Sequence, residues 1–205
     1  MQQIFVTGIS TEVGKTIASA IITEALEADY WKPVQAGDLD NTDSHKVAAL
    51  ISNSKTKIHR SNYELQTPMS PHAAAAIDGL RIETHKIVSP ETENHLVIEG
   101  AGGLLVPLNE DDTILDLIMP NYKVIVVSRH YLGSINHTLL TLNWLKQKGY
   151  EVFLLFSGDK HPTTEQIILH KTGVTSIGRI EEEATFDKAI IKKYAEKFRS
   201  ILLSL

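Results

Sequence analysis

The sequence predicts an α/β fold in which a parallel sheet carries helices on both faces. Short apolar runs alternate with amphipathic stretches along the chain, as expected where strands and helices follow one another. The apolar runs are continuous, which is typical of parallel strands that are covered on both faces. The chain has 205 residues, 42% apolar and 22% charged, a length and balance that suit a single domain spanning residues 1–205.

The predicted elements follow a strand-then-helix order over most of the chain. Strands are predicted at residues 4–6, 96–98, 124–127, 152–156 and 175–180. Helices are predicted at residues 17–26, 113–119, 134–148, 163–170 and 185–203, with another starting near Asp43. Residues 32–90 are less regular and include turn-rich and proline-rich stretches. Functional residues are expected at the carboxyl ends of the strands, where open α/β sheets bind their ligands.

Charge and cysteine content exclude several classes of protein. The formal net charge is −5, which disfavours nucleic acid or an anionic membrane as the main partner. The chain has no cysteine, which excludes disulfides and thiolate metal sites. No signal peptide is recognisable after Met1, and no apolar run approaches the roughly 20 residues that span a bilayer. We therefore expect a cytoplasmic protein whose partners are small molecules.

A phosphate-binding loop is predicted between the first strand and the first helix. Gly8 is followed by five residues and then by Gly14-Lys15-Thr16, at the start of the helix. Backbone N–H groups and the helix dipole attract anions at the start of a helix. In such a loop Lys15 would contact the β- and γ-phosphates, and the Thr16 hydroxyl would bind Mg²⁺. A chance Gly-Lys-Thr is the alternative. The strand–loop–helix order favours a phosphate-loop NTPase fold that binds a purine nucleoside triphosphate, in the first place ATP, with Mg²⁺.

The spacing of this loop points to one family. The usual motif has four residues between its glycines, whereas this chain has five, with Thr11 and Val13 before Gly14. The loop resembles that of the dethiobiotin synthetases, and five further segments fit that family in order. They are Trp31-Lys32-Pro33-Val34-Gln35, Asp43, Ser70-Pro71-His72, Glu99-Gly100-Ala101-Gly102-Gly103 and Leu132-Gly133-Ser134-Ile135-Asn136-His137.

The resemblance implies an enzyme of biotin biosynthesis. The family is an ATP- and Mg²⁺-dependent cyclo-ligase that converts 7,8-diaminopelargonic acid and CO₂ to dethiobiotin, with release of ADP and phosphate. One substrate amine is carbamylated, the carbamate is phosphorylated to a carbamic–phosphoric anhydride, and the second amine attacks and expels phosphate. The resemblance also implies a homodimer.

Two lysines are the candidate catalytic residues. Lys15 and Lys32 follow two strands of one predicted sheet, so both ammonium groups can point at one site. They would stabilise the anionic intermediates and the charge that develops during phosphoryl transfer. The alternative for Lys32 is a surface lysine at the end of a strand.

Three oxygen-bearing residues are candidate Mg²⁺ ligands, namely Thr16, Asp43 and Glu99. Mg²⁺ usually takes one or two carboxylates together with phosphates and waters. Glu99 directly follows an apolar strand, and the glycines after it predict a loop rather than a helix that it would cap. Asp43 is also a good N-cap for the helix that follows, and both roles are compatible.

The remaining candidate residues lie in the same segments. The nucleotide is expected to contact Glu12, Val13, Gly14, Lys15, Thr16, Ile17, Asp43, Glu99, Gly100, Ala101 and Gly102. The resemblance implies that the substrate contacts Thr11, Lys32, Ser70 and Pro71 and, across the dimer interface, Gly133, Ser134 and Asn136. Structural alternatives are a solvated carboxylate at Glu12, a tight turn at 100–103, and ordinary helix starts at 70–71 and 133–134.

Three positions depart from the family pattern. Ala36 stands where the family usually has a hydroxyl residue, so a substrate hydrogen bond is missing there or made by backbone. After strand 152–156 the family commonly has Asn-Asp, whereas this chain has Ser157-Gly158-Asp159. Residues 181–183 are all glutamate, where the family tends to have proline. The preference for ATP therefore follows from the resemblance rather than from a residue that reads the base.

Two other functions are compatible with a phosphate loop. A partitioning or regulatory ATPase switch would usually carry an additional lysine near the start of the loop, which residues 8–10 lack. A degenerate nucleotide-binding module is disfavoured because Lys15, Thr16, Lys32, Asp43 and Glu99 are all present. Dependence of ATP hydrolysis on the diamine distinguishes the ligase from the switch.

Overall fold

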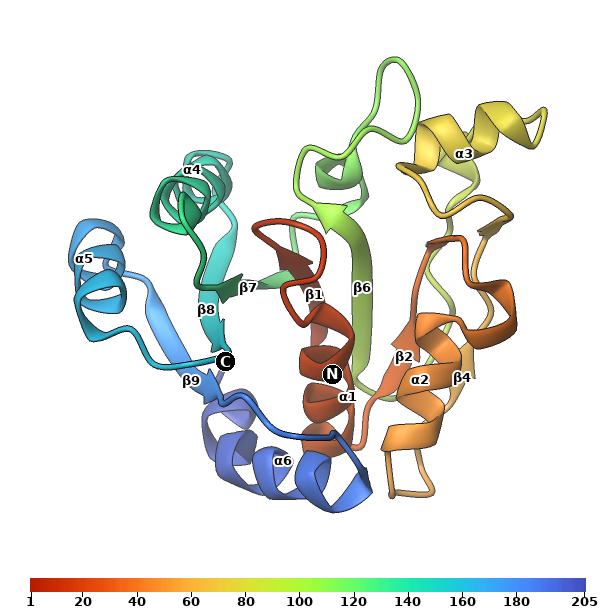
Figure 1. The fold of residues 1–205 in the computed structure, drawn as a ribbon. Helices are drawn as coiled ribbons and strands as arrows, with labels where there is room; N and C mark the ends of the chain where they lie inside the picture. Colours follow the sequence, from red (N-terminus) through yellow and green to blue (C-terminus); the bar gives the residue numbers. More distant parts are fainter.

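A parallel sheet of seven strands forms the centre of the computed structural model, which describes residues 1–205 (Figure 1). The strand order is β4-β2-β6-β1-β7-β8-β9, and every pairing is parallel. These strands are β1 (Gln3–Gly8), β2 (Asp29–Trp31), β4 (Ile58–His59), β6 (Leu96–Gly103), β7 (Lys123–Arg129), β8 (Glu151–Ser157) and β9 (Thr175–Ile180). A separate parallel pair consists of β3 (Val34–Ala36) and β5 (Tyr63–Leu65).

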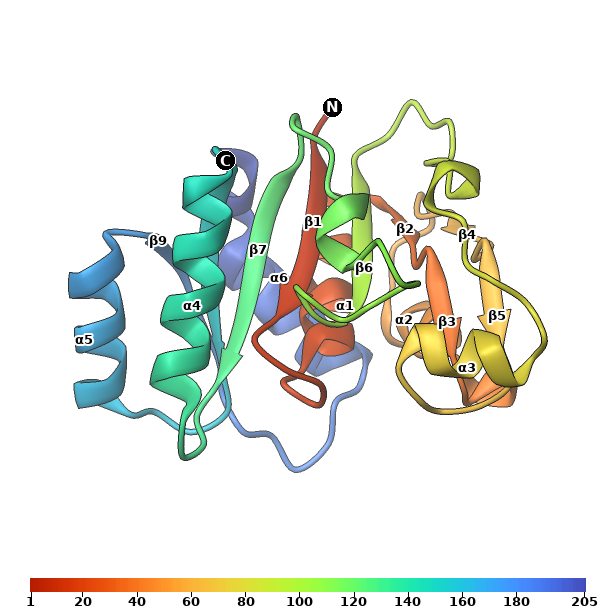
Figure 2. The same cartoon turned by 90° about the horizontal axis from the view of Figure 1, so that it is seen from above.

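Helices cover both faces of the large sheet, which confirms the predicted α/β class (Figures 1 and 2). On one face, α1 (Lys15–Leu26) packs against α2 (Asp43–Leu50) and α6 (Lys188–Leu203). On the other face, α4 (Ser134–Gln147) packs against α5 (Pro162–Thr172). The strands between them contribute to one cluster of 49 buried apolar residues, which explains their continuous apolar runs. None of the helices combines the length and the apolarity needed to cross a membrane.

The less regular part of the chain forms short elements beside the sheet. They are α3 (Pro71–Ile77) and the 3₁₀ turns η1 (Leu39–Asn41) and η2 (Thr84–Lys86). α3 packs on β3 and β5 and lies at the same end of the molecule as the loops that follow β1 and β6 (Figure 2). These short elements therefore border the carboxyl ends of β1, β2 and β6.

Two helix predictions need correction. Residues 113–119 do not form an α-helix, but a short 3₁₀ turn, η3 (Ile114–Leu117). Pro120 disfavours the helical conformation at Met119, and the backbone is already extended at Ile118. The last helix begins at Lys188 rather than at residue 185, because the Asp187 side chain caps it by accepting a hydrogen bond from the Ile190 N–H.

The glycine-rich segment after Ile98 belongs to a strand instead of a loop. β6 continues to Gly103, and its register against β1 shifts between the Val6–Glu99 pair and the Gly8–Gly103 pair. β6 therefore has more residues than β1 between these two pairs and bulges locally. The bulge lies directly after Glu99, beside the phosphate-binding loop.

A buried carboxylate links the segments at the opposite, amino end of the sheet. Asp29 is 4% exposed and accepts hydrogen bonds from the Lys57 N–H (3.0 Å) and the Thr92 hydroxyl (2.8 Å). His59 Nε2 lies 3.0 Å from the same carboxylate, and Asn94 donates to it. Burial alone would raise the pKa of Asp29, but these hydrogen bonds lower it below its ordinary value.

We expect Asp29→Asn to destabilise the protein at about pH 7 by about 1–3 kcal/mol, because buried donors lose their charged acceptor. The contribution of Asp29 is complete above the unfolded pKa of about 4 and is lost as the pH falls through the lower folded pKa. Urea unfolding at about pH 7 and about pH 3 measures both effects. Asp40→Asn, at an exposed carboxylate, is the matched control, and an equal loss in both variants would contradict this role for Asp29.

Candidate active site

A cleft of about 1420 Å³ opens at the carboxyl ends of β1, β2 and β6. Five segments that are distant in sequence line it: the loop after β1, the segment from Lys32 to the start of α2, the turn before α3, the end of β6 with its following loop, and one side of α4. The sequence-predicted phosphate loop, Lys32, Asp43 and Glu99 all lie in this one cleft.

The phosphate loop places a buried lysine at the start of a helix. α1 begins at Lys15, and Gly14 is its N-cap without any side-chain capping bond. The first N–H groups of α1 are therefore available to an anion. Lys15 is only 8% exposed, and its Nζ donates a hydrogen bond of 3.0 Å to the carbonyl of Ser10. Burial lowers the pKa of Lys15 to about 8, although the neighbouring Glu99 opposes this shift.

Two glycines are required by the close packing of this loop. A Cβ on Gly14 would lie 2.8 Å from Ser157 Oγ, and the residue has a φ of 91°. A Cβ on Gly8 would lie 2.6 Å from a methyl group of Val13 and 2.8 Å from the Ser10 carbonyl. Larger residues at either position would displace the backbone that faces the cleft.

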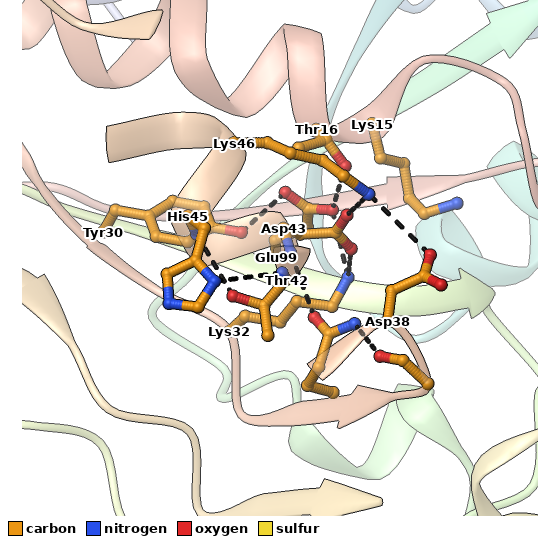
Figure 3. Close-up of polar contacts among 12 residues, drawn as sticks. Lys15, Thr16, Tyr30, Lys32, Asp38, Thr42, Asp43, His45, Lys46 and Glu99 are labelled. Atoms are coloured by element: carbon orange, nitrogen blue, oxygen red, sulfur yellow. Dashed lines mark hydrogen bonds and ion pairs between the residues drawn. The ribbon is translucent and has the colours of Figure 1, made fainter. Parts of the chain in front are cut away.

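The centre of the cleft is a group of four side chains, those of Thr16, Lys32, Asp43 and Glu99 (Figure 3). Lys32 Nζ forms ion pairs with Asp43 Oδ2 and, at 3.2 Å, with Glu99 Oε1. The Thr16 hydroxyl donates a hydrogen bond of 3.0 Å to the same Glu99 oxygen. One hydroxyl and two carboxylates therefore converge, which is the oxygen donor set that Mg²⁺ prefers. No group of three or more His, Cys, Asp or Glu side chains is placed to hold a metal by itself.

Burial and pairing have opposite effects on the charges in this group. Burial alone would lower the pKa of Lys32, but Glu99 and Asp43 outweigh it and raise the pKa above its ordinary value. Burial likewise would raise the pKa of Asp43, whereas Lys32 lowers it. Both residues are therefore held in their charged forms at neutral pH.

The start of α2 shows that Asp43 is not the helix cap. The N-cap is Thr42, whose hydroxyl accepts from the His45 N–H, and Asp43 is the first helical residue. The N-cap interpretation of Asp43 is therefore wrong, and its carboxylate points to Lys32 instead. Gln35 Oε1 accepts from the Asp43 N–H at 3.3 Å and so connects β3 to the start of α2.

The other sequence-predicted residues divide into two groups. Cleft-lining residues comprise Thr11, Glu12, Ile17, Ser70, Pro71, Ala101 and Gly102. Residues outside the lining comprise Val13, Gly100, Gly133, Ser134 and Asn136. Val13 packs into the core, and the Cα of Gly100 faces Phe5 and Ile114. Gly133, Ser134 and Asn136 therefore do not line the cleft of their own chain, whereas His137, in the first turn of α4, does. Gly133 is the N-cap of α4. Ser70 is the N-cap of α3, and its side chain makes no capping hydrogen bond.

Sequence reasoning missed two side chains that contact the charged group. Lys46 Nζ lies 3.4 Å from Asp43 Oδ1 and 4.0 Å from Asp38 Oδ2. The Tyr30 hydroxyl donates a hydrogen bond of 2.9 Å to Glu99 Oε2. The three-residue helical spacing from Asp43 to Lys46 and the two-residue strand spacing from Tyr30 to Lys32 were available signals.

Comparison with known sequences identifies the family. A family model described as an AAA domain matches residues 2–189. The ATP-dependent dethiobiotin synthetase of Christiangramia forsetii is 58% identical over 98% of both chains. That of Cytophaga hutchinsonii is 46% identical over 96% of this chain and 97% of its own. The chain belongs to the dethiobiotin synthetase family. The family recognised from the loop spacing and the ordered segments is therefore confirmed.

Comparison with solved structures shows the shared fold of more distant proteins. A plasmid partition protein from Borrelia burgdorferi aligns with a TM-score of 0.63 at 16% identity, over 99% of this chain and 98% of its own. The MinC:MinD cell division complex of Aquifex aeolicus contains a chain that aligns with a TM-score of 0.62 at 14% identity, over 100% of this chain and 97% of its own. At identities this low, the comparison shows a shared fold and carries no conclusion about function.

The pKa of Lys15 predicts that polyphosphate binding weakens above about pH 8. Its ammonium group is charged below this value and loses its proton as the pH rises through it, so the anion loses its cationic partner. Calorimetric titration with inorganic tripolyphosphate between about pH 7 and about pH 9.5 measures the effect. Lys15→Arg is the control, because arginine keeps its charge over this range. Parallel pH profiles for the two proteins would refute the assignment.

Proposed function

We propose that the chain catalyses the ATP-dependent closure of the cyclic urea of dethiobiotin from 7,8-diaminopelargonic acid and CO₂, with release of ADP and phosphate. The observation that carries the proposal is the 58% identity, over nearly the full length, to a protein named ATP-dependent dethiobiotin synthetase. The protein is therefore a ligase of biotin biosynthesis. We propose that the protein acts in the cytoplasm, because it uses ATP.

The proposed nucleotide site extends along the phosphate loop. The triphosphate of ATP would lie along residues 8–16, against the first N–H groups of α1 and the ammonium group of Lys15. Glu12, Ile17, Ala101 and Gly102, which line the cleft, would border it. Thr16, Asp43 and Glu99 would hold Mg²⁺, which would neutralise charge on the phosphates during transfer. The proximity of the Thr16 hydroxyl to Glu99, at 3.0 Å, supports this set.

Lys15 and Lys32 are the proposed catalytic residues. The carbamate and the carbamic–phosphoric anhydride are both anionic, and both ammonium groups border the cleft. Ammonium groups in a buried site stabilise developing negative charge more than they would in water. The raised pKa of Lys32 keeps it charged, so we assign it charge stabilisation and not proton abstraction. Thr11, Ser70 and Pro71 are the proposed contacts of the diamine end.

A homodimer is part of the proposal, because Gly133, Ser134 and Asn136 do not line the cleft of their own chain. The proposed carboxylate-binding residues, Gly133, Ser134 and Asn136, would then serve the cleft of the partner. Apolar side chains are exposed along this helix at the side of the cleft, among them Leu140 (61%) and Trp144 (44%). Contact with a second copy would remove them from water.

The reaction can be tested directly with the purified protein. Diaminopelargonate, bicarbonate, Mg²⁺ and ATP should yield dethiobiotin and ADP in equal amounts. Lys32→Ala should lower turnover by more than tenfold, which corresponds to about 1.4 kcal/mol of activation free energy. Lys123→Ala, at the amino end of β7, is the control and should keep its activity.

Two outcomes would contradict the proposal. Steady ATP hydrolysis that does not depend on the diamine would favour a partitioning or regulatory ATPase switch instead. Turnover by Lys32→Ala within about tenfold of the wild type would remove Lys32 from the catalytic group. Thermal unfolding of each variant separates loss of activity from loss of structure.

The dimer is tested by its mass in solution. Leu140→Glu should convert the dimer to a monomer, because a charge would be buried at the contact, and the mass is the readout because Leu140 also lines the cleft. Light scattering after gel filtration gives the mass. Ile77→Glu, at a 62%-exposed position on α3, is the control and should stay dimeric. A wild-type protein that is monomeric and active would contradict the proposed sharing of residues.

A further inference from the structure

Tyr30 is a core residue with a polar contact to the site. Its side chain is fully buried, and its hydroxyl donates a hydrogen bond of 2.9 Å to Glu99 Oε2 (Figure 3). Tyr30 pairs with Val97 on β6, two residues before Glu99. Lys32 follows Tyr30 by two residues, the spacing that places side chains on the same face of an extended chain. Tyr30 and Lys32 therefore approach the same carboxylate from neighbouring positions.

The two oxygens of Glu99 have different partners. Oε1 accepts from the Thr16 hydroxyl at 3.0 Å and from Lys32 Nζ at 3.2 Å. Oε2 has one partner, the Tyr30 hydroxyl. Glu99 is 1% exposed, so without Tyr30 this oxygen would be a buried acceptor with no donor.

The hydrogen bond from Tyr30 to Oε2 also fixes the orientation of the Glu99 carboxylate. Rotation about the last torsion of a glutamate side chain is only weakly restricted. A donor fixed in the core restricts it, and a hydrogen bond to an ionised acceptor is shorter and stronger than one between neutral groups. Tyr30 is such a donor, because its side chain is fully buried and its strand is paired on both sides, with β4 and with β6.

We infer that Tyr30 is a positioning residue, which holds Glu99 Oε2 so that Oε1 faces Thr16 and the proposed Mg²⁺ site. The inference rests on the proposed metal role of Glu99. Tyr30 would not touch the cation or the substrate and would act only through Glu99. Replacing a group that orients a metal ligand typically lowers metal affinity by roughly 10- to 100-fold.

Metal affinity tests the inference without reference to catalysis. Mn²⁺ replaces Mg²⁺ as the probe, in the presence of a non-hydrolysable ATP analogue, and free Mn²⁺ is measured by electron paramagnetic resonance. Tyr30→Phe keeps the ring and removes the hydroxyl, and it should weaken Mn²⁺ binding by roughly 10- to 100-fold. Tyr150→Phe removes a hydroxyl that bonds to the Ile118 carbonyl at the opposite end of the sheet, and it should bind Mn²⁺ like the wild type.

A double-variant cycle distinguishes positioning from a general effect on structure. Glu99→Gln should weaken Mn²⁺ binding, and adding Tyr30→Phe to it should change the affinity by less than roughly twofold. An equal effect of Tyr30→Phe in both backgrounds would overturn the inference, as would wild-type affinity in Tyr30→Phe alone. Wild-type affinity in Glu99→Gln would overturn the metal role of Glu99 and the inference with it.

A second measurement applies if Tyr30→Phe does not fold. Placing 3-fluorotyrosine at position 30 alone keeps both ring and hydroxyl. Its ¹⁹F resonance should shift when Mg²⁺ is added to the complex with the nucleotide analogue, and it should not shift in the Glu99→Gln protein. A resonance that does not respond to Mg²⁺, or that responds equally in both proteins, would overturn the inference.

Discussion

Charge pairing among Lys32, Asp43 and Glu99 governs how the cleft is built. Moving an ion out of water costs several kcal/mol unless it is paired, and Lys32 and Glu99 are 4% and 1% exposed. Each charge is tolerable only in the presence of the others, so the segments that carry them must meet. The end of β2, the start of α2 and the middle of β6 are thereby held together, and Gln35 and Thr42 bring Asp43 to the sheet. The chain between Lys32 and Asp43 must therefore turn back to the sheet.

Much of this arrangement could be predicted from sequence. Continuous apolar runs gave the main strands, and the order of strand, loop and helix placed the phosphate loop at a strand end. Since the carboxyl ends of parallel strands share one edge, the meeting of Lys15, Lys32 and Glu99 could be expected. The position of Glu99 within β6 could not be predicted from sequence, because the bulge at 100–102 depends on pairing with β1. The α-helix predicted at residues 113–119 is wrong because the helical spacing of Ile114, Leu117 and Ile118 also suits a 3₁₀ turn. Pro120 then prevents this turn from continuing as a helix.

A plasmid partition protein and the dethiobiotin synthetases share this fold, so the fold alone does not determine the function. Tyr30 illustrates why side chains that contact a site are hard to find from sequence. A tyrosine in an apolar strand is normally counted as core, and the hydroxyl at its tip becomes informative only when its acceptor is known. The exposed apolar side chains of α4 are a comparable case, since helical spacing alone does not distinguish a buried face from an exposed one.

The strand order has a consequence for how the chain acquires its structure. β1 precedes the other strands of the sheet along the chain, yet its neighbours β6 and β7 begin at Leu96 and Lys123, and α1 packs on α6, which begins at Lys188. A ribosome must therefore release most of the polypeptide before the first strand and first helix find their partners. Contacts so distant in sequence slow folding and leave apolar segments open to aggregation meanwhile. The phosphate loop is therefore synthesised before Val127 and Ser157, the residues of β7 and β8 against which Ile9 and Gly14 lie.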